Sequence, residues 1–150
     1  SRISHPRDRF FVGQEIHAVV RYTAPDGKIT LSHKELLGTW EENASLFAPG
    51  ETVAGVVGSV EHYGIFIELT PNLAGLAEPK EDVFPGQQAS VFIKNILPEK
   101  MKVKLIIVDA FDAKYPCVPP RYFLPGSHMD SFLYSPACSD RVIRTDFAAP

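Results

Sequence analysis

One strand–turn–strand pattern occurs twice in the chain, and this repeat restricts the fold more than any other feature of the sequence. The copies are residues 11–32, "FVGQEIHAVVRYTAPDGKITLS", and residues 84–106, "FPGQQASVFIKNILPEKMKVKLI". Each copy begins with Phe-x-Gly-Gln and then places an apolar residue at every second position, which is typical of strands with one buried face. The alternating residues of the first strand are Ile16, Ala18 and Val20 in one copy and Ala89, Val91 and Ile93 in the other. The copies lie roughly 73 residues apart, about the length of one small β domain.

Residues 50–109 contain five short apolar segments separated by turns, several of them with glycine. These segments are 51–60, 64–70, 72–79, 88–96 and 101–108. Five short strands of this kind predict a small closed barrel, because closure leaves no strand with an unpaired edge. We therefore expect a mainly β protein.

Residues 32–47, "SHKELLGTWEENASLF", have helical rather than strand spacing. Ser32 and Glu35 stand at capping-box spacing, as do Thr39 and Glu42. The apolar positions that share one helical face are Leu36, Leu37, Trp40, Ala44 and Phe47. We predict two short helices that are broken at Gly38, with Trp40 as a packing residue because it lies on the apolar face.

The tail, residues 110–150, is interrupted by prolines but is rich in aromatic residues. Its segments 131–135 and 141–147 predict a β-hairpin with residues 136–140 as the turn. The aromatic content indicates that the tail folds onto another part of the chain. We expect residues 120–147 to pack against or near residues 11–47, or else residues 11–47 to pair with another chain.

Composition limits the classes of partner and chemistry. The net charge is −3 and no segment is strongly basic, so bulk charge would not hold a polyanion. No apolar run is long enough for a membrane span and no signal peptide is visible, so no membrane partner is expected. Two cysteines, Cys117 and Cys138, fit a reducing cytoplasm. The histidines lack metal-site spacing and no nucleophile–base pair is present, so neither a metal, a cofactor nor an enzyme is expected.

The stretch "EHYGIFIELT", residues 61–70, places aromatic rings where water can reach them. Ile65, Ile67 and Leu69 alternate onto one face of the predicted strand, and Phe66 begins the opposite, wet face. Tyr63 stands just before Phe66, across Gly64. We expect Gly64 to supply a bulge that brings the two rings together. The alternative is that both rings cover the barrel mouth or pack on the neighbouring half-domain.

In this region the sequence resembles the S1 RNA-binding domain family, which is named after a protein of the bacterial small ribosomal subunit. The marks that match, in order, are Gly50, Val53, Gly55, Val57, Tyr63-Gly64-x-Phe66, Gly75-Leu76, Gly86-Gln87 and the last hairpin. The family fold is a five-stranded OB-type barrel. The resemblance implies a complete S1 domain at 48–109, preceded by the C-terminal half of an S1-like domain at 1–37 and a helical linker at 38–47, and followed by an extension at 110–150. We accordingly expect this chain to be the C-terminal piece of a longer protein with tandem S1 domains.

The resemblance also implies a binding site, in which Tyr63 and Phe66 stack on bases of single-stranded RNA. Glu78 stands where the family often has a histidine, and Lys102 where it has an arginine; Leu97 replaces an aspartate. A carboxylate near phosphates is unfavourable, so affinity is expected to be lower than in a strong RNA-binding S1 domain. A basic cluster with an exposed aromatic offers compensation, although an ordinary solvated face explains it equally well. Its members are Phe92, Lys94, Lys100, Lys102 and Lys104.

Two functions remain in competition at the level of sequence. The first is a cytoplasmic translation protein that binds single-stranded RNA, either mRNA or rRNA, with the small ribosomal subunit as a further partner. The second is a protein-interaction module on an S1 barrel whose RNA affinity has weakened. Salt-sensitive binding of a short RNA separates the two.

Overall fold

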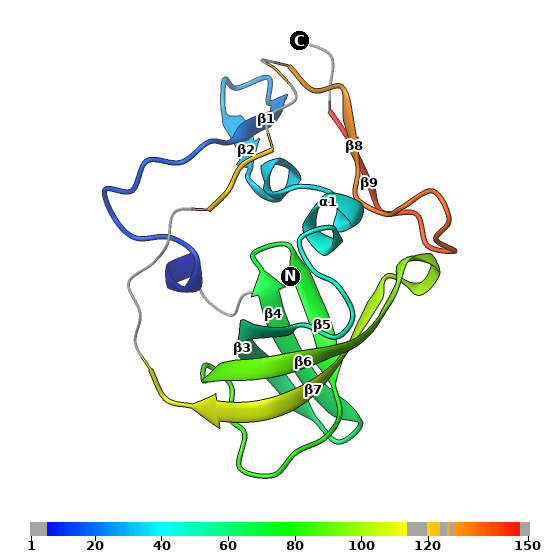
Figure 1. The fold of residues 1–150 in the computed structure, drawn as a ribbon. Helices are drawn as coiled ribbons and strands as arrows, with labels where there is room; N and C mark the ends of the chain where they lie inside the picture. The colour runs from blue at the N-terminus through cyan, green and yellow to red at the C-terminus, as the bar shows by residue number, and fades with distance from the viewer. Residues whose placement is uncertain (1–5, 114–119, 124–125, 127, 148–150) are drawn as a thin grey trace.

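The computed structural model describes residues 6–113, 120–123, 126 and 128–147, and Figure 1 shows their arrangement. The described chain is mainly β, as the sequence predicts. The elements before the barrel are η1 (Pro6–Asp8), β1 (Val19–Thr23), β2 (Ile29–Ser32), η2 (Lys34–Leu37) and α1 (Trp40–Ala44). The barrel comprises β3 (Thr52–Glu61), β4 (Gly64–Thr70), β5 (Leu73–Ala77), β6 (Gln88–Leu97), η3 (Pro98–Lys100) and β7 (Lys102–Phe111), and the tail adds β8 (Ser131–Leu133) and β9 (Arg144–Asp146). None of the helices in these ranges is long and apolar enough to cross a membrane.

The five central strands close into a barrel in the order β3-β4-β5-β7-β6, which confirms the predicted architecture (Figure 1). All neighbours are antiparallel except β5 and β7, which run parallel. The alternating residues predicted to face inward do so: Ile67, Val91 and Ile93 have no accessible surface. Gly55 also faces the interior, and a Cβ there would lie 2.4 Å from the Ile67 side chain. Glycine at this position therefore lets β3 approach β4 closely enough for the barrel to close.

The helical segment covers one end of the barrel. Both predicted helices form and are separated at Gly38; the first is a short 3₁₀ helix. The Thr39–Glu42 capping box is present, whereas the expected Ser32–Glu35 box is not made. His33 is the N-cap of η2, and the Ser32 hydroxyl instead donates to the Glu35 carboxylate.

The predicted packing role of Trp40, on α1, is confirmed: its side chain is 2% exposed and belongs to the core cluster of the barrel. Polar contacts fix the same junction. The Asn72 side-chain amide donates to the Gly38 carbonyl over 2.8 Å, and the Thr70 hydroxyl donates to the Asn43 side chain over 2.6 Å. The turn between β4 and β5 is thereby held against the helices.

The first copy of the repeat forms a hairpin that is shorter than its sequence pattern predicts. Strand β1 begins at Val19, so Ile16 and Ala18 precede the strand and do not extend it. The apolar face of the hairpin is open: Val20 is 52% exposed, and Ile29 and Leu31 are each 60% exposed. An isolated two-stranded hairpin is marginally stable in water, so an open apolar face is unfavourable for this one.

The tail hairpin β8–β9 confirms the predicted pair of strands. The tail packs near residues 11–47, as predicted, but its contacts fall on the helices, the loop before β1 and the barrel, and the apolar face of the β1–β2 hairpin stays exposed. The Phe123 amide donates to the Leu36 carbonyl (2.8 Å), and the Trp40 amide donates to the Tyr134 carbonyl (2.9 Å). The Tyr134 hydroxyl also donates to the Asn72 carbonyl over 2.6 Å, so the tail ties the helices to the barrel.

A second tail contact involves Tyr122, whose hydroxyl lies 2.8 Å from Nε2 of His33. Burial lowers the pKa of His33; the Arg9 charge acts in the same direction and the Glu35 carboxylate opposes it. The neutral imidazole is therefore favoured beside the tyrosine. Of the two cysteines, Cys138 is an exposed free thiol and Cys117 lies outside the described residues.

Candidate nucleic-acid interface

Three aromatic rings line the end of the barrel where β3 turns into β4. The Tyr63 and Phe66 ring centroids lie 6.2 Å apart at an interplanar angle of 84°. His62 contacts the other side of Tyr63, with ring centroids 5.2 Å apart at 89°. Tyr63 is 54% exposed and Phe66 is partly buried. The structure therefore places the two predicted stacking residues side by side at the surface, and it adds a histidine ring that sequence reasoning missed.

The local backbone explains this arrangement, although not in the way we expected. Glu61 pairs with Gly64, so His62 and Tyr63 form a two-residue turn. The register shift lies in β3, between Val57 and Val60, and the predicted bulge at Gly64 is therefore wrong. Gly64 instead allows close packing, because a Cβ there would lie 2.7 Å from the Ala77 carbonyl oxygen. The turn is thus pressed against β5, and Tyr63 extends from a well-supported position.

A row of outward-facing residues continues from the aromatic pair across the barrel. Phe66 on β4 is in register with Leu76 on β5, and Leu76 is in register with Lys104 on β7. Neighbouring strands are about 4.8 Å apart, so the Lys104 backbone lies on the order of 10 Å from that of Phe66. Lys102, which begins β7 two residues before Lys104, is also exposed. A backbone phosphate of a nucleotide stacked on Phe66 is within reach of a flexible lysine side chain at this distance.

Glu78 does not stand as an isolated negative charge in this row. The Lys94 ammonium lies 3.1 Å from its Oε1, and both side chains are more than half exposed. An exposed ion pair of this kind contributes little to stability, but it offsets the local field of each partner. The repulsion that the sequence predicts between Glu78 and phosphates is consequently weakened, and so is the attraction expected from Lys94.

Two predicted residues lie apart from the aromatic pair. Phe92 on β6 is in register with Thr52 on β3 and Ile106 on β7, on a different part of the barrel circumference from Phe66. Lys100 lies in η3 at the tip of the β6–β7 hairpin, where the adjacent Glu99 carbonyl accepts from the Asp140 amide of the tail. Phe66, Leu76 and Lys104 therefore lie along one row, whereas Phe92 and Lys100 lie apart from it.

Arg9 is a second residue that sequence reasoning missed. Its guanidinium donates to Glu68 Oε1 over 2.7 Å, and its side chain is 12% exposed. Glu68 lies two residues beyond Phe66 on the same face of β4. Arg9 therefore offsets an acidic charge on the candidate face. The only signal in the sequence was its place in a short basic segment far from β4.

Within the described ranges, no group of three or more histidine, cysteine, aspartate or glutamate residues is arranged to hold a metal ion. The candidate interface offers stacking surfaces, hydrogen bonds and charges. These are the contacts with which OB barrels hold oligonucleotides.

Comparison with known proteins gives a consistent set of relatives. The chain is 26% identical over 118 residues to small ribosomal subunit protein bS1 of Rhizobium meliloti, covering 69% of this chain and 21% of that protein. It is 30% identical over 119 residues to bS1 of Chlamydia trachomatis, covering 71% and 21%, and 31% identical over 125 residues to bS1 of Staphylococcus haemolyticus, covering 71% and 32%. The chain therefore spans about a fifth to a third of the length of these relatives.

No protein-family model matches the chain. A solved structure of an uncharacterized protein from Methanocaldococcus jannaschii aligns with 39% of this chain and 89% of that chain, at 30% identity and a TM-score of 0.37.

Proposed function

We propose that this chain binds single-stranded RNA. Its sequence is similar to the bS1 proteins over about 70% of its length, and its strands β3–β7 form a closed five-stranded barrel. The observation that carries the proposal is the exposed aromatic pair Tyr63 and Phe66, which a soluble barrel has no packing need to display. Rings on the outer face of such a barrel provide stacking platforms that tolerate any base. The partner would be an unstructured stretch of mRNA or rRNA at the small ribosomal subunit in the cytoplasm.

The charge distribution supports weak binding without strong sequence preference. Lys102 and Lys104 follow the row that begins at Phe66, while Glu78 and Glu68 are each offset by a basic partner. Among the described residues of this face, Lys102 and Lys104 are the positive charges left to contact phosphates. We therefore expect a shallow salt dependence, since each phosphate contact with a single strand adds about 0.7 to the slope of log affinity against log salt.

A fluorescently labelled oligouridine, titrated with the whole chain at several salt concentrations, tests this proposal. Saturable binding that weakens with salt supports it. Nuclear magnetic resonance on the labelled protein should then show the largest shifts at Tyr63, Phe66 and Lys104. The absence of binding at low salt, or shifts confined to β1 and β2, contradicts the proposal.

A specific observation favours the competing function of protein interaction. The open apolar face of β1–β2 includes Val20, Ile29 and Leu31, all more than half exposed. In the second copy of the repeat, the matching face is buried by β3, β4 and β5. We propose that residues 1–37 are the second half of an S1-like unit and that this face is covered by a partner sheet in the working protein. Protection of residues 19–32 from hydrogen exchange by a protein partner, without oligouridine binding, would favour this function.

A further inference from the structure

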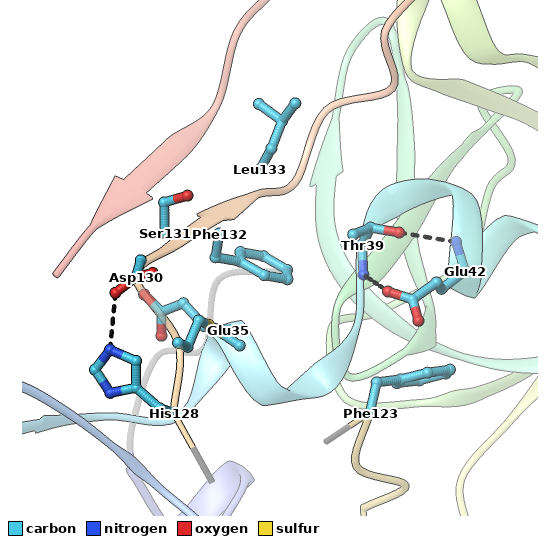
Figure 2. Close-up of a pocket in the computed structure, with 10 residues that line it drawn as sticks. Glu35, Thr39, Glu42, Phe123, His128, Asp130, Ser131, Phe132 and Leu133 are labelled. Carbon is cyan, nitrogen blue, oxygen red and sulfur yellow. Dashed lines mark hydrogen bonds and ion pairs between the residues drawn. The ribbon is translucent and has the colours of Figure 1, made fainter. Parts of the chain in front are cut away.

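A pocket of about 720 Å³ lies between the helices and the tail, on elements outside the candidate RNA face. Its wall comprises η2, the start of α1, Phe123, and residues 128–133, the last three of which form β8. Figure 2 shows that three carboxylates border it, from Glu35, Glu42 and Asp130, together with the rings of Phe123 and Phe132. Clefts of this size are typical of small-molecule sites. A ligand that fits this lining has groups that donate hydrogen bonds to carboxylates and an apolar part that packs against phenyl rings.

Glu35 is the most informative residue of the wall. Its side chain is fully buried, and the Ser32 hydroxyl donates to Oε2. The other oxygen, Oε1, has no hydrogen-bond partner among the described residues. A buried polar atom without a partner is unfavourable, and a buried carboxylate oxygen especially so. Figure 2 shows this side chain extending from η2 toward Asp130 and His128. The site therefore holds an acceptor that a donor from outside the described chain would satisfy.

The remaining carboxylates divide the pocket into two anionic ends. Asp130 is at the Glu35 end, where its Oδ1 lies 2.8 Å from His128 Nε2. Glu42 is at the opposite end, where its Oε1 accepts the Thr39 amide hydrogen over 2.9 Å and its Oε2 makes no hydrogen bond within the described residues. Figure 2 shows the Phe132 ring between the two ends. A ligand that matches this order has a cationic group at each end and an apolar chain in the middle.

A metal ion does not fit this description. The carboxylates are distributed over the pocket, and no metal-holding cluster exists in the described part of the chain. An organic ammonium group fits better, because it donates hydrogen bonds to carboxylates and is also attracted to the faces of aromatic rings. We propose that this pocket binds an aliphatic polyamine, with one ammonium group directed to Glu35 and Asp130, another to Glu42, and the methylene chain against Phe132.

Access to Glu35 requires a small rearrangement. Its Oε1 has almost no accessible surface, so a side chain of the wall must move before an ammonium group can reach it. The residues on that side precede β8, which pairs over only three residues with β9. Such a short ribbon opens at low cost. Binding is therefore expected to slow hydrogen exchange in residues 128–133, where the ligand closes the pocket.

Isothermal titration calorimetry of the whole chain with spermidine at low salt tests the proposal. The wild type should bind one spermidine. Glu35→Gln should weaken binding by about tenfold to a hundredfold, since the hydrogen bond from a charged ammonium group to a buried carboxyl oxygen is lost. Asp130→Asn should weaken it by roughly twofold to fivefold, because Asp130 is exposed and its contact is screened. The matched control is Glu41→Gln, which removes the same charge from an exposed position on α1 outside the pocket and should leave affinity unchanged.

Three results would overturn the proposal. The first is the absence of saturable spermidine binding by the wild type. The second is an equal loss of affinity in Glu35→Gln and Glu41→Gln, which would show that only net charge matters. The third is equally tight binding of n-butylamine, a single ammonium on an apolar chain, which would contradict a site with two anionic ends. Asp130→Asn keeps the test valid should Glu35→Gln fail to fold, because Asp130 is on the surface and its replacement by Asn does not threaten the core.

Discussion

Replacement of the aromatic pair by alanine is the most direct test of the RNA-binding proposal. Base–aromatic stacking contributes about 1–3 kcal/mol per base. Tyr63 is 54% exposed and offers a free face, so Tyr63→Ala should cost an amount within this range. Phe66 is partly covered and should cost less, about 1 kcal/mol. The two single losses sum to about 2–4 kcal/mol, which corresponds to roughly 30-fold to nearly 1,000-fold in affinity.

The geometry adds a prediction about the shape of the bound RNA. The two rings are nearly perpendicular, so bases stacked on Tyr63 and Phe66 cannot be parallel to one another. Bound RNA is therefore expected to bend between the two stacked bases. Because the rings also contact each other edge to face, the two single substitutions should not be additive, and the double variant should depart from their sum by about 0.5 kcal/mol or more.

Fluorescence anisotropy with a labelled oligouridine at low salt measures these losses. Tyr22→Ala is the matched control: it removes a tyrosine of similar exposure, 49%, from β1 rather than from the barrel, and should leave affinity unchanged. Circular dichroism confirms that each variant is folded. A folded Tyr63→Ala/Phe66→Ala variant with wild-type affinity would refute the stacking argument. A loss no larger than that of Tyr22→Ala would refute it as well.

Three further outcomes are expected from single substitutions. Glu78→His should tighten oligouridine binding, and Glu78→Gln should tighten it less. Each variant removes a negative charge and releases Lys94 from its ion pair, but only histidine adds an aromatic ring. Wild-type affinity in both variants, measured by anisotropy, would show that the RNA site lies elsewhere. Lys104→Gln should reduce the slope of log affinity against log salt by about 0.7, and an unchanged slope would exclude a phosphate contact. Burial raises the pKa of Tyr134 to about 12, so the unfolded chain ionises first and stability is lost as pH rises from 10 to 12. For this partly buried group we expect the loss to be about 1–2 kcal/mol, and chemical denaturation of Tyr134→Phe should show a smaller dependence on pH across that window.

The barrel and its aromatic pair could be predicted from the sequence because both depend on local patterns. Alternation with period two identified the inward residues Ile67, Val91 and Ile93, and all three are fully buried. The Thr39–Glu42 spacing identified a helix start in the same way. Where a residue's partners are close in sequence, the pattern carried enough information to locate it.

Contacts between distant segments were beyond the reach of these patterns. Arg9 contacts Glu68 across 59 positions of the chain, and no pattern in either segment predicts this ion pair. Glu78 and Lys94 were both predicted at the site, but their pairing, which changes the expected electrostatics, was not foreseen. The sequence marks Gly64 as a special position but does not show why, since a glycine required for close approach and a glycine required for a bulge look alike in sequence.

The two copies of the repeat show the same limit within one molecule. Val91 in the second copy has no accessible surface, whereas Val20, in the first copy, is 52% exposed, although both occupy alternating positions of a strand that follows Phe-x-Gly-Gln. The difference arises outside the hairpins: β6 is paired with β3 and β7 and faces the other barrel strands, whereas β1 is paired with β2 alone among the described strands. Burying an apolar side chain of this size contributes about 1.5–3 kcal/mol, so a few such residues decide whether the hairpin is stable by itself. The pattern within a hairpin therefore specifies which face must be covered, and the strands that cover it are specified elsewhere.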